Sequence, residues 1–220
     1  MKKITLLSSV AFALIFSACK KDAANDVTDP TAFGVSVNGK IVTVKNLPAD
    51  TILGIGQFGP YGAGKYTFFN LNSNTLVPNS DSATNNWDLA FAGNTIRINA
   101  GTSGPGNGGA FVFNGSFDAL TAVPVDSTFR IDNAPTSYAI TKGSGKGWYN
   151  YDGQNNLITA IPGRTLVIKT ANGKYAKVEI MNYYKGGSTP LSTASDSIKA
   201  FDSRYFTFRY TYQGNGTTTF

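Results

Sequence analysis

The sequence contains no histidine and only one cysteine among its 220 residues. These absences exclude a Ser-His-Asp triad, a Cys-His nucleophile, a zinc site made of histidine and cysteine, and histidine-ligated haem. Glu179 is the only glutamate, and no aspartate lies in a recognisable catalytic motif. The sequence therefore offers no clear pair of carboxylates for a glycosidase mechanism. We predict that the protein is not an enzyme and has no metal site, with an aspartate-based hydrolase as the minor alternative.

Charge is also sparse, since only 15% of the residues are charged, and the formal net charge is +6. The basic residues are spread along the chain. The doublet Lys20-Lys21 is too short to follow a phosphate backbone, so we predict no nucleic-acid partner.

The N-terminus is typical of a secretory signal peptide. Two lysines precede an apolar run, Ile4 to Phe16, that is too short to span a membrane comfortably. The small residues Ser17 and Ala18 then lead directly to Cys19. Because this lone cysteine has no disulfide partner, we predict that residues 1–18 are cleaved and that Cys19 is lipidated. The protein would then be exported and anchored to a membrane without spanning it.

The rest of the chain divides into a short polar segment and one β-rich domain. Residues 19–31 include the cysteine and lack periodicity, and we predict that they form a flexible tether. Beyond them, frequent glycine and turn clusters interrupt short alternating runs, which is typical of antiparallel sheet. We predict that residues 32–220 form a single all-β domain with little helix, the helix lying over Ser195–Phe201.

Two Asn-Gly pairs, Asn38-Gly39 and Asn172-Gly173, predict tight β-hairpins, because both turn positions need positive φ. A two-residue turn at the second pair places Val167 opposite Val178. In that register, Met181 shares the apolar face of the hairpin with Leu166, Ile168 and Tyr175.

The last predicted strand, Tyr205–Tyr212, alternates strictly between two kinds of residue. The face expected to be buried carries Phe206, Phe208, Tyr210 and Tyr212. The face expected to be wet carries Thr207, Arg209 and Thr211. Such regular alternation indicates a strand with one buried side.

Aromatic residues and one methionine are the candidates for a ligand site. Tyr149 and Tyr151 lie beside amide and carboxyl residues, and Tyr183 follows the second hairpin. Such groups can stack on a sugar or on a flat macrocycle, or they can be ordinary sheet residues. Met181 is the only methionine after cleavage of the signal peptide. Its thioether could ligate haem iron, although such a methionine more often fills a packing gap.

Several segments, taken in order, resemble the HmuY family of exported haem-binding lipoproteins of Bacteroidota. Their order and spacing cover most of residues 60–213. The segments are Asn86–Phe91, Ile96–Asn99 with the glycine-rich stretch 101–109, Gly147-Trp148, Gly163–Lys185 and Tyr205–Gln213.

The resemblance implies an all-β fold, a lipid anchor and often a location on the outer-membrane surface. It further implies capture of haem for a TonB-dependent receptor. Haem-binding members hold iron with paired axial ligands, histidine or sometimes methionine. One ligand comes from the turn corresponding to Asp152-Gly153-Gln154, and the other from the region corresponding to 131–142. In this sequence neither place holds histidine or methionine, so the fold can be shared while the iron ligation is not.

Two functions remain open from the sequence. The first is an exported, membrane-anchored lipoprotein that binds an extracellular small molecule for TonB-dependent uptake. By resemblance that molecule is haem or another porphyrin, and the candidate binding residues are Met181, Tyr149, Tyr151 and Tyr183. The second is a glycan-binding or structural surface lipoprotein that uses the same scaffold without haem.

Replacing Cys19 with alanine is expected to abolish lipidation and to release the protein from the membrane fraction. Anchoring depends on burial of acyl chains, at about 0.8 kcal/mol per CH₂, and the variant cannot acquire them. Metabolic labelling with a fatty acid measures this directly. Label retained on the Cys19→Ala protein would contradict the assignment.

Overall fold

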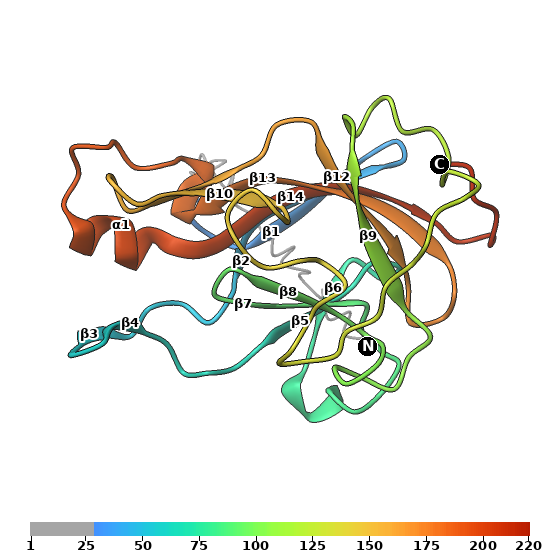
Figure 1. The fold of residues 1–220 in the computed structure, drawn as a ribbon, viewed down its shortest axis with the longest axis horizontal. Coiled ribbons are helices and arrows are strands. Elements are labelled where there is room, and N and C mark those ends of the chain that lie inside the picture. The colour runs from blue at the N-terminus through green and yellow to red at the C-terminus, as the bar shows by residue number, and fades with distance from the viewer. Residues whose placement is uncertain (1–28) are drawn as a thin grey trace, which may run out of the picture.

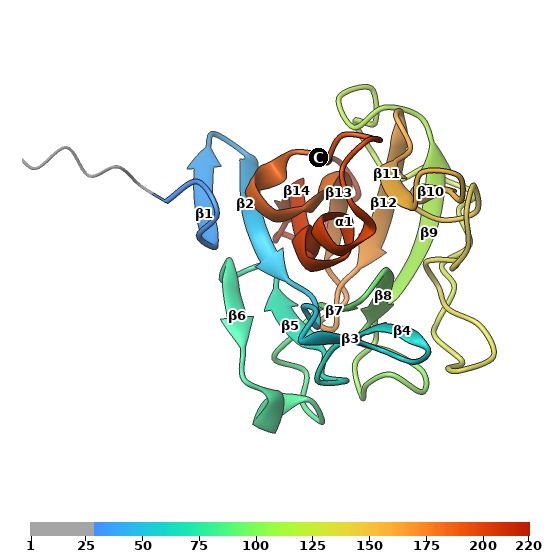
Figure 2. The ribbon, with the colours of Figure 1, turned by 90° about the vertical axis from the view of Figure 1, so that its left-hand side faces the viewer.

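Two antiparallel sheets face each other in the computed structural model, which describes residues 29–220 (Figures 1 and 2). Two small hairpins and one short α-helix lie toward one end. The predicted all-β architecture with little helix is confirmed. No helix within residues 29–220 is long and apolar enough to cross a membrane. The predicted signal peptide and Cys19 lie outside the described residues.

The larger sheet has six strands in the order β1-β2-β14-β13-β12-β9. The two longest strands, β13 and β14, lie in its middle, so the aromatic C-terminal strand is central to the sheet. The strands are β1 (Gly34–Asn38), β2 (Ile41–Pro48), β9 (Gly109–Asn114), β12 (Arg164–Lys169), β13 (Tyr175–Tyr184) and β14 (Ser203–Gln213).

The smaller sheet has the order β6-β5-β7-β8. Its strands are β5 (Thr67–Asn70), β6 (Thr75–Val77), β7 (Leu89–Ala92) and β8 (Thr95–Ile98). The separate hairpins are β3 (Gly54–Gly56) with β4 (Gly59–Tyr61) and β10 (Tyr149–Asp152) with β11 (Leu157–Ala160).

Helical structure is limited to three short segments of the described chain. They are the 3-10 turns η1 (Asn79–Asp81) and η2 (Lys185–Gly187) and the helix α1 (Asp196–Asp202). The Ser195 side chain caps α1 by accepting a hydrogen bond from the Ile198 N–H. The predicted helix over Ser195–Phe201 is therefore confirmed.

Phenylalanine rings join the two sheets. Phe91 of β7 lies 5.0 Å from Phe206 and 5.4 Å from Phe208, measured between ring centroids. Phe69 of β5 lies 5.7 Å from Phe208 in an edge-on arrangement. All four rings are fully buried, and aromatic pairs at such distances stabilise a core beyond simple burial. The predicted buried face of β14 is confirmed at these positions.

The opposite face of β14 is less exposed than predicted, since Thr207 and Thr211 are also buried. Thr211 pairs with Lys177 of β13. The Lys177 ammonium donates to the carbonyls of Phe117 and Leu120, at 2.7 and 2.8 Å, in the chain that follows β9. The prediction of a wet face is therefore wrong for both threonines. Alternation shows which residues share a face, but not whether a distant segment covers it.

Both Asn-Gly hairpins form, but the first turn is displaced by one residue and the second is one residue longer than predicted. Asn38 pairs with Ile41, so the first turn is Gly39-Lys40. At the second hairpin, Leu166 rather than Val167 lies opposite Val178, because residues 171–173 form a longer connection. A slip of one residue exchanges the faces of a strand. The predicted register is therefore wrong, and Tyr175 lies on the face of the large sheet that points away from the smaller sheet.

The Phe208→Ala variant is expected to lose about 3–5 kcal/mol of unfolding free energy, because it leaves a cavity between the sheets. Phe58→Ala is the matched control, since Phe58 is 98% exposed, and it should change stability by less than about 0.5 kcal/mol. Denaturant unfolding of both variants measures the difference. Equal losses would show that the aromatic interface is not the core.

Candidate functional site

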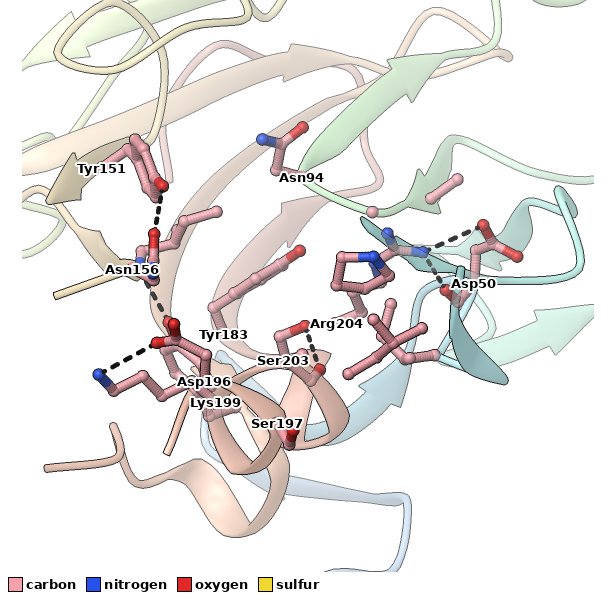
Figure 3. A pocket seen from close by; sticks show the side chains of 18 of the residues that line it. Asp50, Asn94, Tyr151, Asn156, Tyr183, Asp196, Ser197, Lys199, Ser203 and Arg204 are labelled. Atoms are coloured by element: carbon pink, nitrogen blue, oxygen red, sulfur yellow. Dashed lines mark hydrogen bonds and ion pairs between the residues drawn. The ribbon is translucent and has the colours of Figure 1, made fainter. Parts of the chain in front are cut away.

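A cavity of about 830 Å³ lies where α1 meets the two small hairpins (Figure 3). It falls within the ~300–1,000 Å³ range of small-molecule sites. Its wall combines apolar and polar side chains from five parts of the chain. Representative members are Ile55 and Pro60 from β3–β4, Asn94 after β7, Tyr151 and Ile158 from β10–β11, Tyr183 from β13, and Ala200 and Arg204 from α1 and β14.

Tyrosines form one wall of the cavity. The Tyr151 hydroxyl donates to Oδ1 of Asn156 at 2.8 Å, and Tyr151 is 49% exposed. The Tyr184 hydroxyl accepts the Ile158 N–H at 2.8 Å, which fixes β11 against β13. Tyr183 is buried, and burial raises the pKa of its phenol well above the usual value. At neutral pH Tyr183 therefore presents an uncharged phenol to the cavity.

Asn94 connects this wall to the smaller sheet. Its carbonyl accepts the indole N–H of Trp148 at 3.1 Å, and its side-chain amide donates to the Tyr149 hydroxyl at 3.0 Å. Both rings are buried. The β7–β8 turn is thus fixed against the start of β10, and Asn94 is held at the cavity wall (Figure 3).

The opposite wall includes the β3–β4 arm, which we define as residues 51–64. One oxygen of the Asp50 carboxylate accepts the backbone N–H of Gly64 at 2.7 Å, and that of Lys65 at 3.3 Å. Asp50 therefore holds both ends of the arm together. The arm carries apolar side chains that are largely exposed, namely Leu53, Ile55, Phe58 and Tyr61.

Arg204 lies at the junction between the arm and the large sheet. Its Nη1 donates to the Asp50 backbone carbonyl at 2.8 Å and lies 3.4 Å from the Asp50 carboxylate. Figure 3 shows these contacts beside the tyrosine wall. Lys199, the cavity's other cation, lies 3.7 Å from the Asp196 carboxylate and donates to the Ser192 carbonyl at 2.8 Å.

The structure brings two of the four predicted ligand residues, Tyr151 and Tyr183, to the cavity. Tyr149 lies behind the wall and contacts the cavity residue Asn94. Met181 is 50% exposed and does not line the cavity. It occupies a β-bulge in β13, where the register with β14 shifts between Ile180 and Asn182. The predicted lipidation site, Cys19, lies outside the described residues.

The two places that correspond to the family's iron ligands hold other chemistry. In the turn after β10, the Asp152 carboxylate accepts the Gln154 N–H at 2.9 Å, which stabilises the turn itself. Asn156, at the end of that turn, reaches the cavity. Within residues 131–142, none lines this cavity. Residues 29–220 hold no cluster of three or more histidine, cysteine, aspartate or glutamate side chains placed for a metal.

Sequence reasoning missed Arg204, Asp50 and Asn156. All three adopt positive φ, namely 68°, 57° and 52°. A scan for non-glycine residues in turn contexts would have suggested Asp50 and Asn156, because Asp and Asn tolerate this conformation. Arg204 lies between the predicted helix, Ser195–Phe201, and the predicted strand, Tyr205–Tyr212, and gives no such signal.

Comparison with known proteins gives one matching family and several similar structures. The model of the HmuY protein family matches residues 63–194. No curated protein sequence matches the chain. A candidate lipoprotein from Bacteroides fragilis NCTC 9343 shares 16% identity at a TM-score of 0.51, over 82% of this chain and 95% of that one.

Two further solved structures are similar at lower TM-scores. One is a candidate HmuY-like haem-binding protein from Bacteroides vulgatus ATCC 8482, with 16% identity, a TM-score of 0.47, and coverage of 79% of this chain and 92% of that one. The other is the apo HmuY analogue of Tannerella forsythia, with 13% identity, a TM-score of 0.41, and coverage of 83% and 97%.

The buried Tyr183 phenol is expected to make stability fall at alkaline pH. Its pKa is raised in the folded protein, so its contribution is complete below the unfolded value of about 10 and is lost as pH rises toward the folded value. Tyr183→Phe should therefore lose less stability than wild type above about pH 10. Denaturant midpoints measured at pH 8 to 11 test this. If the midpoints of wild type and Tyr183→Phe changed in parallel with pH, Tyr183 would ionise as readily in the folded protein as in the unfolded one.

Proposed function

The chain belongs to the HmuY family, and on this premise we propose that it binds haem or another porphyrin in the cavity between α1 and the two small hairpins. Members of this family are binding proteins rather than enzymes. We propose the same for this chain. The proposal also covers location. Residues 1–18 would act as a signal peptide for export, and Cys19 would anchor the protein at the outer-membrane surface, with residues 19–31 as a tether. The bound molecule would then be transferred to a TonB-dependent receptor.

The cavity itself carries the proposal. A flat macrocycle needs apolar surface on both faces, and the cavity lining includes Ile55 and Pro60 from the arm together with Ile158 and the Tyr183 ring from β11 and β13. Aromatic rings add stacking to apolar burial. The arm that forms one wall has exposed apolar residues, and a bound macrocycle would cover part of that surface.

Iron ligation contributes little in this proposal. The only mature methionine, Met181, lies outside the cavity, and histidine is absent from the sequence. Among the tyrosines of the cavity, Tyr183 could ligate iron only after loss of a proton that burial holds in place. We therefore expect stacking and burial to supply most of the affinity, and we expect no low-spin spectrum of the kind that two histidines give.

A glycan is the second candidate ligand. The cavity includes the amides of Asn94 and Asn156 beside the half-exposed ring of Tyr151. Amide groups next to an aromatic ring suit the hydroxyls and the apolar face of a sugar. This alternative uses the same cavity and the same lipid anchor, but it requires no uptake receptor.

Filling the cavity tests the proposal. Ala200 lines it on α1, so Ala200→Trp is expected to weaken porphyrin binding by about tenfold or more, equivalent to about 1.4 kcal/mol. Titration with ferric haem and with metal-free protoporphyrin IX, followed by visible absorbance, measures both affinities. We expect wild type to bind both molecules with similar affinity.

Two variants serve as controls for this titration. Ala119→Trp adds the same side chain at an exposed site outside the cavity, and Met181→Ala removes the excluded thioether. Both should bind like wild type. A selective loss of haem affinity in Met181→Ala would show that the Met181 thioether does ligate the iron. Saturable binding of neither porphyrin by wild type would reject the uptake function and favour the glycan or structural alternative.

A further inference from the structure

Arg204 has an unusual backbone for a residue within a strand. Its φ is 68°, in the left-handed region that residues other than glycine, asparagine and aspartate rarely adopt. Such conformations are strained and concentrate at functional sites, where the surrounding structure enforces them. Arg204 lies at the cavity wall and its side chain is only 20% exposed. The fold therefore holds a charged group in this place at a local cost.

The guanidinium keeps part of its hydrogen-bonding capacity. Among residues 29–220, the short hydrogen bonds of the Arg204 side chain run from Nη1 to Asp50, and the Tyr183 phenol lies next to the guanidinium. Nε and Nη2 make no hydrogen bond of this length within residues 29–220 and are not buried without a partner, so they face the cavity beside the Tyr183 phenol. The planar edge formed by Nε and Nη2 is the edge that pairs with both oxygens of a carboxylate.

Asp50 does not fully neutralise the positive charge of Arg204. The same carboxylate accepts the backbone N–H groups of Gly64 and Lys65, which share its negative charge. Lys199 differs, because its side chain is only 6% exposed and its ammonium donates to the Ser192 carbonyl beside Asp196. Of the two cations that line the cavity, Arg204 is the one better placed to receive an additional anion.

We propose that Arg204 binds a carboxylate of the ligand, so that the cavity selects flat apolar molecules that carry an acidic group. This assignment rests on the proposed function and adds its specificity: the macrocycle packs between the hydrophobic walls, and its acidic edge points to the junction of β14 with the arm. Arg204 would then distinguish a dicarboxylic porphyrin from a neutral molecule of the same shape.

Binding of protoporphyrin IX and of its dimethyl ester tests the assignment. The two molecules share the ring system, but the ester has no carboxylate. Hydrogen bonds to charged groups contribute about 1.5–3 kcal/mol, so wild type should bind the free acid about 10- to 100-fold more tightly than the ester. Arg204→Gln should remove this preference by lowering the affinity for the free acid alone, and Arg204→Lys should retain part of the preference.

Matched variants separate binding from folding. Unchanged affinity of Arg204→Gln for the ester shows that the cavity is intact, whereas loss of both ligands would assign Arg204 a structural role and overturn the proposal. Lys199→Gln and the exposed control Arg130→Gln should keep the wild-type preference; its loss in Lys199→Gln would overturn the assignment to Arg204. Equal affinity of wild type for acid and ester overturns the Arg204 proposal but leaves porphyrin binding standing. Binding of neither overturns both.

Discussion

The packing of a single ring, Phe206, connects the stability of the fold to the shape of the cavity. Its centroid lies 5.0 Å from Phe91 in the smaller sheet and 5.0 Å from Trp148 at the start of the β10 hairpin. It also lies 5.3 Å from Tyr183, which faces the cavity. Core packing is dense and transmits displacement. The tyrosine wall is therefore placed by the same ring that joins the two sheets, and the cavity has a rigid side.

The other side of the cavity is held by polar contacts instead. The arm of residues 51–64 pairs only with itself as a two-stranded hairpin, and Asp50 and Arg204 fix its base. An isolated hairpin is marginally stable by itself. The site therefore combines a wall set by aromatic packing with an arm that depends on a few hydrogen bonds. Under the proposed function, this asymmetry suits a cavity that would admit a large, flat molecule and then enclose it.

The regular parts of the fold could be predicted from the sequence, and the irregular parts build the site. Alternation in β14 correctly gave the buried row that begins with Phe206, and the Asn-Gly pairs correctly gave two hairpins. The same patterns misplaced Met181, because the predicted turn was one residue too short and because a bulge follows Ile180. β-Bulges are common near functional sites, where they change the direction in which a side chain points. Nothing local in the sequence marks this one.

Long-range placement was the other part that local pattern could not supply. Tyr151 and Tyr183 looked like candidates because of their neighbours in the chain, and both line the cavity. Arg204 was not among the candidates, because its role depends on Asp50, which is far away in the sequence. A family whose haem-binding members ligate iron can thus keep its scaffold when the ligands are absent, because sheet packing and the cavity do not depend on them. In the proposed function, recognition of the ligand depends on the shape of the cavity, its apolar surface and the Arg204 guanidinium. By this proposal, the cavity would discriminate between ligands by shape and charge rather than by metal.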